Sequence, residues 1–438
     1  MFKTFKQALQ IEEIRKKLFF TFLMLIVVRI GSQLPTPGVN PDYIQQFFAM
    51  QTGGAFNFFN AFTGGSFEQM SIFALSISPH ITSSIIMQLL TIAFPKLEEM
   101  QKDGEGGRKK IEAITRYVTV ALAVIQSAAM AIGFGRQGLL VNYNFWSVVM
   151  VVLTLTAGSA FLMWIGERIT EKGIGNGISI ILLINILSTI PGDFTSLYNQ
   201  FMKGKNIGIA ALAGVIIVAI VLAVIIFVIL LQDGQRKIAV QYSQKVQGRK
   251  SVGGQSTFIP LKVNTAGVVP VIFASSLMQF PVIIASFLGK GEGKGFWGQV
   301  LTGLNSNNWC NPGKWTANWG LVLYIILTIA FAYFYTSITF NPLEIANNMK
   351  KNGGFIPGIR PGKPTVDYLA KILRYIIFIG AVGLIIVQII PFFFNGMLGA
   401  KVSFGGTSLI IIVGVLLETI QQIESKMLVR NYQGFLNK

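Results

Sequence analysis

Residues that could support acid–base or metal chemistry are few in this 438-residue chain. The sequence contains one histidine, His80, and one cysteine, Cys310. His80 follows Pro79 inside an apolar stretch without an acidic neighbour. It therefore suits helix packing or a pore lining better than catalysis, because a general base needs a positioned partner. Cys310 has no second cysteine to pair with and no histidine at metal-ligand spacing, so we predict no enzyme, no metal and no cofactor.

A glycine-rich stretch, Gly173–Gly177, invites comparison with a phosphate-binding loop. It follows an amphipathic segment rather than a strand and lacks the lysine of such loops, which disfavours nucleotide binding. A hinge at the start of a helix or a close contact between helices is the better interpretation, because glycine permits both.

The elements that must carry these residues are apolar. Hydrophobic residues make up 52% of the chain and charged residues only 12%, which is too little charge for an ordinary globular surface. A helix needs about 20 mostly apolar residues to cross a bilayer, and ten segments meet that test. They run approximately over 18–34, 71–94, 113–135, 146–166, 174–190, 207–231, 266–288, 321–340, 369–391 and 408–423. We expect an all-α membrane protein with ten transmembrane helices.

Lysine and arginine are concentrated in every second loop. They gather in the N-terminal segment, near 96–110 and 168–172, in the loops 232–265 and 341–368, and at the C-terminus. Because such residues are retained on the cytoplasmic side during insertion, we expect both termini to be cytoplasmic. The outer segment 35–70 contains no Lys or Arg and is rich in Gly and Phe, so it should pack against other parts of the protein.

The expected spans are nearly free of charge. Arg29, Arg116 and Glu418 lie away from the middle of their spans, where a terminal position or an interhelical pair accounts for them. Spans 71–94 and 266–288 instead contain hydroxyls and prolines. Such mildly polar helices either line an interior or seam, or are joined by interhelical hydrogen bonds.

The two largest basic loops are longer than turns require. Residues 238–260 show near-alternating apolar positions among polar ones, which predicts a projecting hairpin. Lys and Arg clusters beside a membrane commonly bind anionic lipid. An acidic partner or RNA is the sharper interpretation.

Distinctive motifs follow one another along nearly the whole chain. They are Ile72–Leu75, Gln88–Thr91, Asp103–Arg108, Phe161–Trp164, Gly173–Ile180, Gln255–Thr257, Pro260–Asn264, Ile272–Ser276, Phe355–Gly362 and Phe404–Leu409. In this order they resemble the bacterial SecY family, the central channel subunit of the Sec protein translocase. The resemblance implies two pseudo-symmetric inverted halves, residues 1–206 and 207–438, that close around an hourglass pore.

The same resemblance implies roles for individual residues. A ring of branched aliphatic side chains would seal the pore, since apolar constrictions gate by dewetting. The ring positions correspond to Ile77, Ile81, Ile178, Leu182, Ile272 and Ile411. Leu182 stands where a β-branched residue is common in the family, and this change keeps the apolar character.

A plug and a lateral gate are implied as well. The plug corresponds to residues 55–70, with Gly64 and Gly65 as its hinge beside Ser66 and Phe67. The gate would separate the second and third spans from the seventh and eighth. Its polar contacts correspond to Thr82, Gln126 and Asn264, and a few hydrogen bonds of about 1 kcal/mol each would hold it closed.

The resemblance finally implies partners and a location. Loops around Arg249, Lys250 and Arg360 would dock the ribosome and the SecA ATPase, so the energy source is external. SecE and SecG subunits, signal sequences, unfolded polypeptides and lipids complete the expected partners, in the bacterial cytoplasmic membrane.

The expected function is a protein-conducting channel that moves secretory precursors across the membrane and membrane proteins into it. A secondary transporter of small solutes is the alternative, although such transporters usually carry charge at mid-membrane. A membrane insertase without a pore is a third possibility.

Overall fold

Helices make up most of the structure, a computed structural model that describes residues 9–40, 42–44, 60, 62–204, 206–242, 245–247, 250–252, 256–287, 295–398 and 406–436. The α-helices are α2 (Glu12–Gly31), α5 (Ser78–Ala93), α6 (Pro95–Lys102), α7 (Glu105–Phe134), α8 (Phe145–Lys172), α9 (Gly177–Phe201), α10 (Ile207–Asp233), α11 (Val269–Phe287), α12 (Phe296–Leu304), α13 (Trp319–Thr339), α14 (Pro342–Lys351), α15 (Lys363–Leu398) and α16 (Gly406–Leu436). Short helical turns occupy η1 (Gly135–Leu139), η2 (Ser306–Asn308) and η3 (Pro312–Asn318).

Each of the ten expected spans overlaps one of these helices. Among the described residues, seven helices are long and apolar enough to cross a membrane. Helices α2, α5 and α11 do not meet that criterion: α2 carries charge at both ends, α5 has 16 residues, and α11 has a short described apolar stretch, Val269–Val282. The chain is thus a multi-pass membrane protein, and the count of ten remains a prediction.

The second expected span differs from its prediction. A continuous helix over 71–94 is wrong, because α5 begins only at Ser78 and the residues from 72 to 77 form turns. Met70 and Ser76 have positive φ angles of 45° and 49°, which are incompatible with a right-handed helix. The Ser76 carbonyl accepts a hydrogen bond from Ser159 Oγ of α8 at 3.0 Å. Contacts from another helix therefore replace local helical bonds here.

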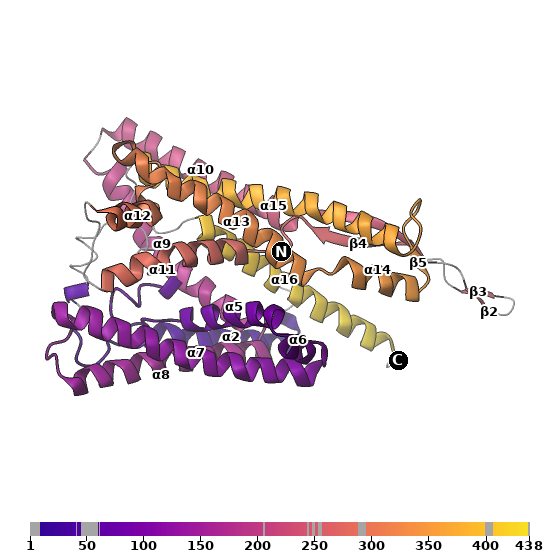
Figure 1. Ribbon diagram of the computed structural model, residues 1–438, viewed down its shortest axis with the longest axis horizontal. Coiled ribbons are helices and arrows are strands. Elements are labelled where there is room, and N and C mark those ends of the chain that lie inside the picture. Colours follow the sequence, from indigo (N-terminus) through magenta and orange to yellow (C-terminus); the bar gives the residue numbers. More distant parts are fainter. Residues whose placement is uncertain are drawn as a thin grey trace.

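Figure 1 shows the helices in two main layers. Helices α2, α5, α7 and α8 lie along the bottom of the view, α10, α13 and α15 lie along the top, and α11 and α16 run between them. Helices on either side of residue 207 meet chiefly where α11 contacts α7 and where α9 contacts α10 and α16. One apolar cluster lies within residues 44–155 and another within 224–413. The helices before residue 207 and those after it thus form two groups, each with its own core.

The predicted hairpin is confirmed. Strand β1 (Gln235–Tyr242) pairs antiparallel with β4 (Ser256–Lys262), from Gln235 opposite Lys262 to Gln241 opposite Ser256. Strands β2 (Lys245–Gln247) and β3 (Lys250–Val252) pair farther along the same hairpin. Strand β5 (Gly354–Phe355) adds to the free edge of β1. The two basic loops are thus joined in one small sheet, which packs against α14 and α15 at the end of the helix bundle, and only β2 and β3 project beyond these helices (Figure 1).

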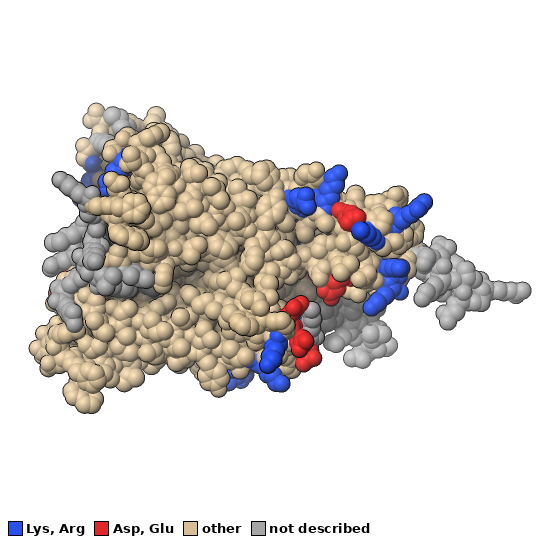
Figure 2. Space-filling model, in the orientation of Figure 1, with Lys and Arg blue, Asp and Glu red and all other residues tan. Residues whose placement is uncertain are grey.

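Charged side chains mark the same end of the molecule. Figure 2 shows most of the visible Lys, Arg, Asp and Glu residues toward the end of the molecule that carries the sheet, α14 and α6, with a few at the opposite end and none in the broad middle of this face. A wide uncharged belt is what the hydrocarbon core of a membrane requires, because an exposed charge there is costly. The charged end carries the basic loops that the sequence assigns to the cytoplasm.

Candidate functional site

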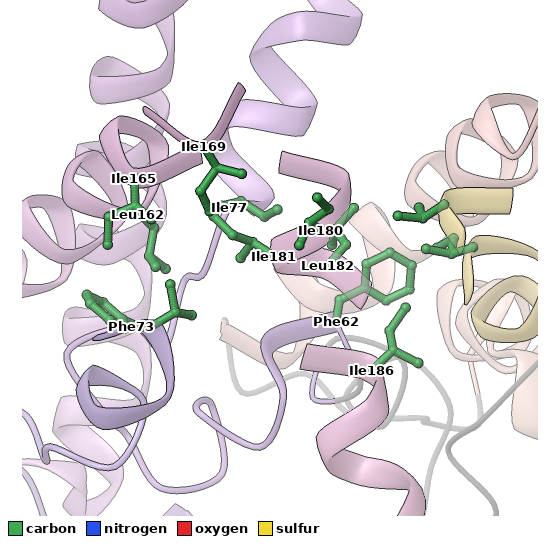
Figure 3. Packing of buried hydrophobic residues seen from close by; sticks show 13 residues of the cluster. Phe62, Phe73, Ile77, Leu162, Ile165, Ile169, Ile180, Ile181, Leu182 and Ile186 are labelled. Atoms are coloured by element: carbon green, nitrogen blue, oxygen red, sulfur yellow. The ribbon is translucent and has the colours of Figure 1, made fainter. Parts of the chain in front are cut away.

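A buried apolar cluster joins helices from both groups (Figure 3). Ile77, Leu182 and Ile411 are among its buried members, with exposed fractions of 1%, 7% and 3%. The partly buried Ile81, Ile178 and Ile272 pack against it. The structure therefore brings all six predicted ring residues to one place, from the turn before α5 and from α5, α9, α11 and α16.

The cluster extends beyond the predicted ring. Phe62 precedes the glycine pair of the predicted plug and lies beside Leu182 and Ile186 of α9 in Figure 3. Further buried members come from α8, namely Leu162, Ile165 and Ile169. The sequence places Phe62 in the predicted plug and Leu162 in a family motif but assigns none of the α8 residues to the seal, because a buried aliphatic residue in an apolar helix looks the same whether it faces a pore or a neighbouring helix.

The chemistry of this cluster is uniform. Its buried members are branched aliphatic residues with two phenylalanines, Phe62 and Phe73. Side chains of this kind offer no hydrogen bonds to water or ions, so a narrow path between them favours the dry state. They also form no side-chain hydrogen bonds that would select one polypeptide sequence over another.

The described part of the predicted plug is folded into the protein. Gly64 and Gly65 have φ angles of 68° and 82°, a conformation that glycine adopts at little cost. Ser66 is buried, and Phe67 belongs to the apolar cluster of residues 44–155. Residues 55–59 and 61 of the plug prediction lie outside the described residues.

The three predicted gate residues do not hydrogen-bond to one another in the described structure. Thr82 Oγ1 donates to Ser78 O of its own helix at 3.0 Å, because a threonine hydroxyl readily reaches the carbonyl four residues earlier. Gln126 Oε1 and Asn264 Nδ2 are both buried without a hydrogen-bond partner among the described residues. Helix α7, which carries Gln126, does contact α11.

The predicted docking residues belong to the projecting end. Arg360 is exposed in the loop between β5 and α15. Lys250 is the first residue of β3, near the far end of the hairpin (Figure 1). Arg249 lies outside the described residues.

The glycine-rich loop is a contact between helices, as the sequence indicates. The backbone N–H groups of Ile174, Gly175 and Gly177 donate to Thr21, Gln422 and Thr170, at 3.2, 3.1 and 2.9 Å. Side chains of α2, α16 and α8 thus occupy the donors that a phosphate-binding loop would present.

Two further polar residues have packing roles. His80 Nδ1 lies 3.3 Å from Thr119 Oγ1, which joins α5 to α7. Arg116 Nε donates to Glu167 Oε1 at 2.6 Å. The interhelical pair expected for Arg116 is thereby confirmed.

Comparisons with known proteins agree with these features. A family model described as SecY matches residues 71–420. "Protein translocase subunit SecY" of Bacillus subtilis is 44% identical over 444 residues, which cover 100% of each chain. The protein of the same name from Pseudomonas aeruginosa is 41% identical over 430 residues, covering 98% of this chain and 94% of that one.

Solved structures of low sequence identity share the fold. "The structure of a protein conducting channel" matches with a TM-score of 0.65 at 18% identity and covers 94% of this chain and 93% of that one. "Sec61 in the Canine ribosome-channel complex from the endoplasmic reticulum" matches with a TM-score of 0.62 at 17% identity, with the same coverage. From the match over most of its length and the similarity to its relatives, the chain belongs to the SecY family.

Proposed function

We infer that this chain is the channel subunit of a protein translocase, which passes polypeptides across the bacterial cytoplasmic membrane and releases apolar segments into it. The observation that carries this inference is the meeting of Ile77, Ile81, Ile178, Leu182, Ile272 and Ile411 in one apolar cluster built by helices from both groups. Relatives that match the full chain carry the name of a translocase subunit.

The apolar cluster acts as the seal of the resting channel. Its aliphatic side chains exclude water and ions when packed together. An extended polypeptide separates them without breaking a hydrogen bond, because the ring side chains make none. The segment around Phe62 and Gly64 is the plug, since Phe62 packs within the cluster and its carbonyl accepts a hydrogen bond from Asn185 of α9.

The two groups of helices, within residues 1–206 and 207–438, are the halves that move apart. Their separate apolar cores support this division, because each half keeps its own packing when the other moves. The contact between α7 and α11 is the lateral gate.

The gate is weakly held in the closed state. Buried and unpaired polar atoms cost about 1–3 kcal/mol each, and Gln126 and Asn264 contribute one such atom apiece. A signal sequence that inserts between α7 and α11 separates the two helices, so that these atoms form hydrogen bonds that they lack in the closed seam. The closed seam is therefore easier to open than a fully paired one.

The cytoplasmic sheet and Arg360 form the docking surface for external motors, the SecA ATPase and the ribosome. The surface projects from the membrane-embedded helices and is basic, which suits an acidic protein surface or ribosomal RNA. Two structural relatives were solved in ribosome complexes, canine Sec61 and yeast Ssh1. SecE and SecG are the companion subunits, and both termini lie in the cytoplasm.

Reconstituted vesicles test this function. We expect a secretory precursor to enter vesicles that contain this chain and its companion subunits only when SecA and ATP are added. Vesicles without the chain are the control. Solute uptake driven by an ion gradient through the chain alone, with no precursor import, would instead establish a secondary transporter.

A crosslink locates the path of the substrate. A photoreactive residue at Ile272 should attach to a precursor stalled during import, whereas the same residue at the exposed Leu277 of α11 should attach to lipid. Precursor crosslinks that are strong at Leu277 and absent at Ile272 would count against the assigned pore.

A further inference from the structure

The segment assigned as the plug is held by polar side chains from two helices. Asn185 of α9 is 2% exposed, and its Nδ2 lies 3.1 Å from Phe62 O and 3.1 Å from Ser76 Oγ. Both amide hydrogens are therefore used, one on the plug backbone and one on the turn that precedes α5. The hydrogen bond to Ser76 Oγ holds the Asn185 side chain in the orientation that its hydrogen bond to Phe62 O requires.

A second contact is made two residues farther along the plug. Arg29 Nη1 of α2 lies 3.3 Å from Gly64 O and 3.0 Å from Ser188 Oγ. Ser188 Oγ also lies 2.6 Å from Asn185 O of its own helix and 3.2 Å from Gly64 O. Ser188 thus places the guanidinium of Arg29 against the plug carbonyl.

The geometry of Gly64 makes this approach possible. Its φ angle is 68°, and a Cβ atom built there would lie 2.9 Å from Asn185 Cα. The plug backbone therefore contacts α9 directly, with no side chain between them. A residue larger than glycine would push the Gly64 carbonyl away from Arg29 and Ser188.

The two partners of Arg29 in the described structure are neutral oxygens. A partly buried guanidinium in a membrane-spanning helix is tolerated when it is hydrogen-bonded, and it is costly otherwise. Displacement of the plug removes the Gly64 carbonyl from this site. Arg29 thereby favours the seated plug until water enters the outer part of the channel and replaces the carbonyl.

We propose that Asn185, Arg29 and Ser188 form a latch on the plug backbone that determines how readily the resting channel opens and how strictly it selects signal sequences. The proposal rests on the channel function inferred above. The latch binds two carbonyl groups, Phe62 O and Gly64 O, so it does not depend on the side chains of the plug. The apolar ring supplies the seal, and the latch sets the free energy of removing the plug from it.

The test measures release of the plug directly. The full chain with its companion subunits carries Cys310→Ser and Ser66→Cys, which places a single thiol in the buried part of the plug. In this background we compare Asn185→Leu, Ser188→Ala and Arg29→Lys. Thr189→Val is the matched control, because Thr189 is on the same helix and, among the residues that the structure describes, its hydroxyl donates to Ile186 O of that helix and not to the plug.

A membrane-impermeant thiol reagent reports how often the plug leaves its site. We expect the labelling rate to rise roughly fivefold for each lost hydrogen bond, with Thr189→Val equal to the parent. The ion leak of the vesicles and their import of precursors with defective signal sequences should rank the variants in the same order as the labelling rate does. If Asn185→Leu does not accumulate, Ser188→Ala and Arg29→Lys decide the outcome.

Labelling rates of all latch variants within twofold of Thr189→Val would overturn the latch. If precursor import remained normal in that case, the channel function would stand without it. A parent protein that imports no precursor would overturn the proposed function, and the labelling rates would still report whether these residues hold the segment.

Discussion

Gln422 of α16 accepts a hydrogen bond from the backbone N–H of Gly175, with 3.1 Å between Oε1 and N. This bond connects the last helix of the chain to the glycine-rich loop between α8 and α9. The loop joins the C-terminal end of α8 to the N-terminal end of α9. It is therefore part of the contact between the two groups of helices. Apolar packing of Ile14, Ile174 and Ile423 supports the same contact.

Substitution Gly175→Ala should destabilise this contact. The φ angle of Gly175 is 83°, and a Cβ there would lie 2.7 Å from Ile180 Cδ1 and 3.2 Å from Thr419 Oγ1. A non-glycine residue in this conformation costs about 1–3 kcal/mol. Thermal unfolding in detergent should show a lower midpoint, while Gly192→Ala, in a helix with open space around it, should leave it unchanged or raise it. Equal midpoints for both variants would contradict this account of the loop.

Substitution Ile411→Asn should weaken the seal. An unpaired amide in the apolar cluster costs about 1–3 kcal/mol, enough to raise the open fraction roughly tenfold. The resting ion leak of vesicles and the import of precursors with defective signal sequences measure this effect. Leu416→Asn on the same helix is the control, because Leu416 is 46% exposed at the surface. A leak that increases equally in both variants would point to general damage.

Substitution Arg360→Glu should impair motor docking without opening the channel. The exposed basic loop loses one positive charge and gains a negative one, so binding of SecA should weaken most at low salt, where screening is least. Binding titrations at two salt concentrations and the resting leak provide the two readouts. Lys203→Glu makes the same charge change at an exposed position after α9, on the opposite side in the expected topology, and should leave SecA binding unchanged. Unaltered SecA binding by Arg360→Glu would exclude this loop from the docking surface.

The thiol of Cys310 should react slowly at neutral pH. Burial raises the pKa of Cys310, because the charged thiolate is desolvated more than the neutral thiol. The fraction of reactive thiolate is therefore smaller than for an exposed cysteine at every pH below that pKa. The control is the double variant Asn142→Cys, Cys310→Ser, which carries an exposed thiol instead. Between pH 7 and 10, the rate of maleimide labelling of Cys310 should continue to rise at pH values where the labelling rate of the control has levelled off. Superimposable pH profiles would show that burial does not control this thiol.

The sequence by itself determined the class of protein, most of the helices and the hairpin. Apolar runs long enough for a bilayer and the alternation over 238–260 are local patterns, so they predict local structure without knowledge of partners. The family resemblance carried by the ordered motifs also identified six ring positions. The structure brings these six residues together in one cluster. Their role in a pore remains a proposal.

Only the tertiary structure decided where polar groups find their partners. Asn185 meets Phe62 across 123 residues of chain, and Gln422 meets Gly175 across 247. Such partners also explain why the helix predicted from residue 71 starts at Ser78, since Ser159 and Asn185 satisfy the Ser76 turn. A hydrogen bond depends on the position of both groups to within a few tenths of an ångström. Hydrophobic patterning constrains which face of a helix is buried, but it does not constrain which buried donor meets which acceptor.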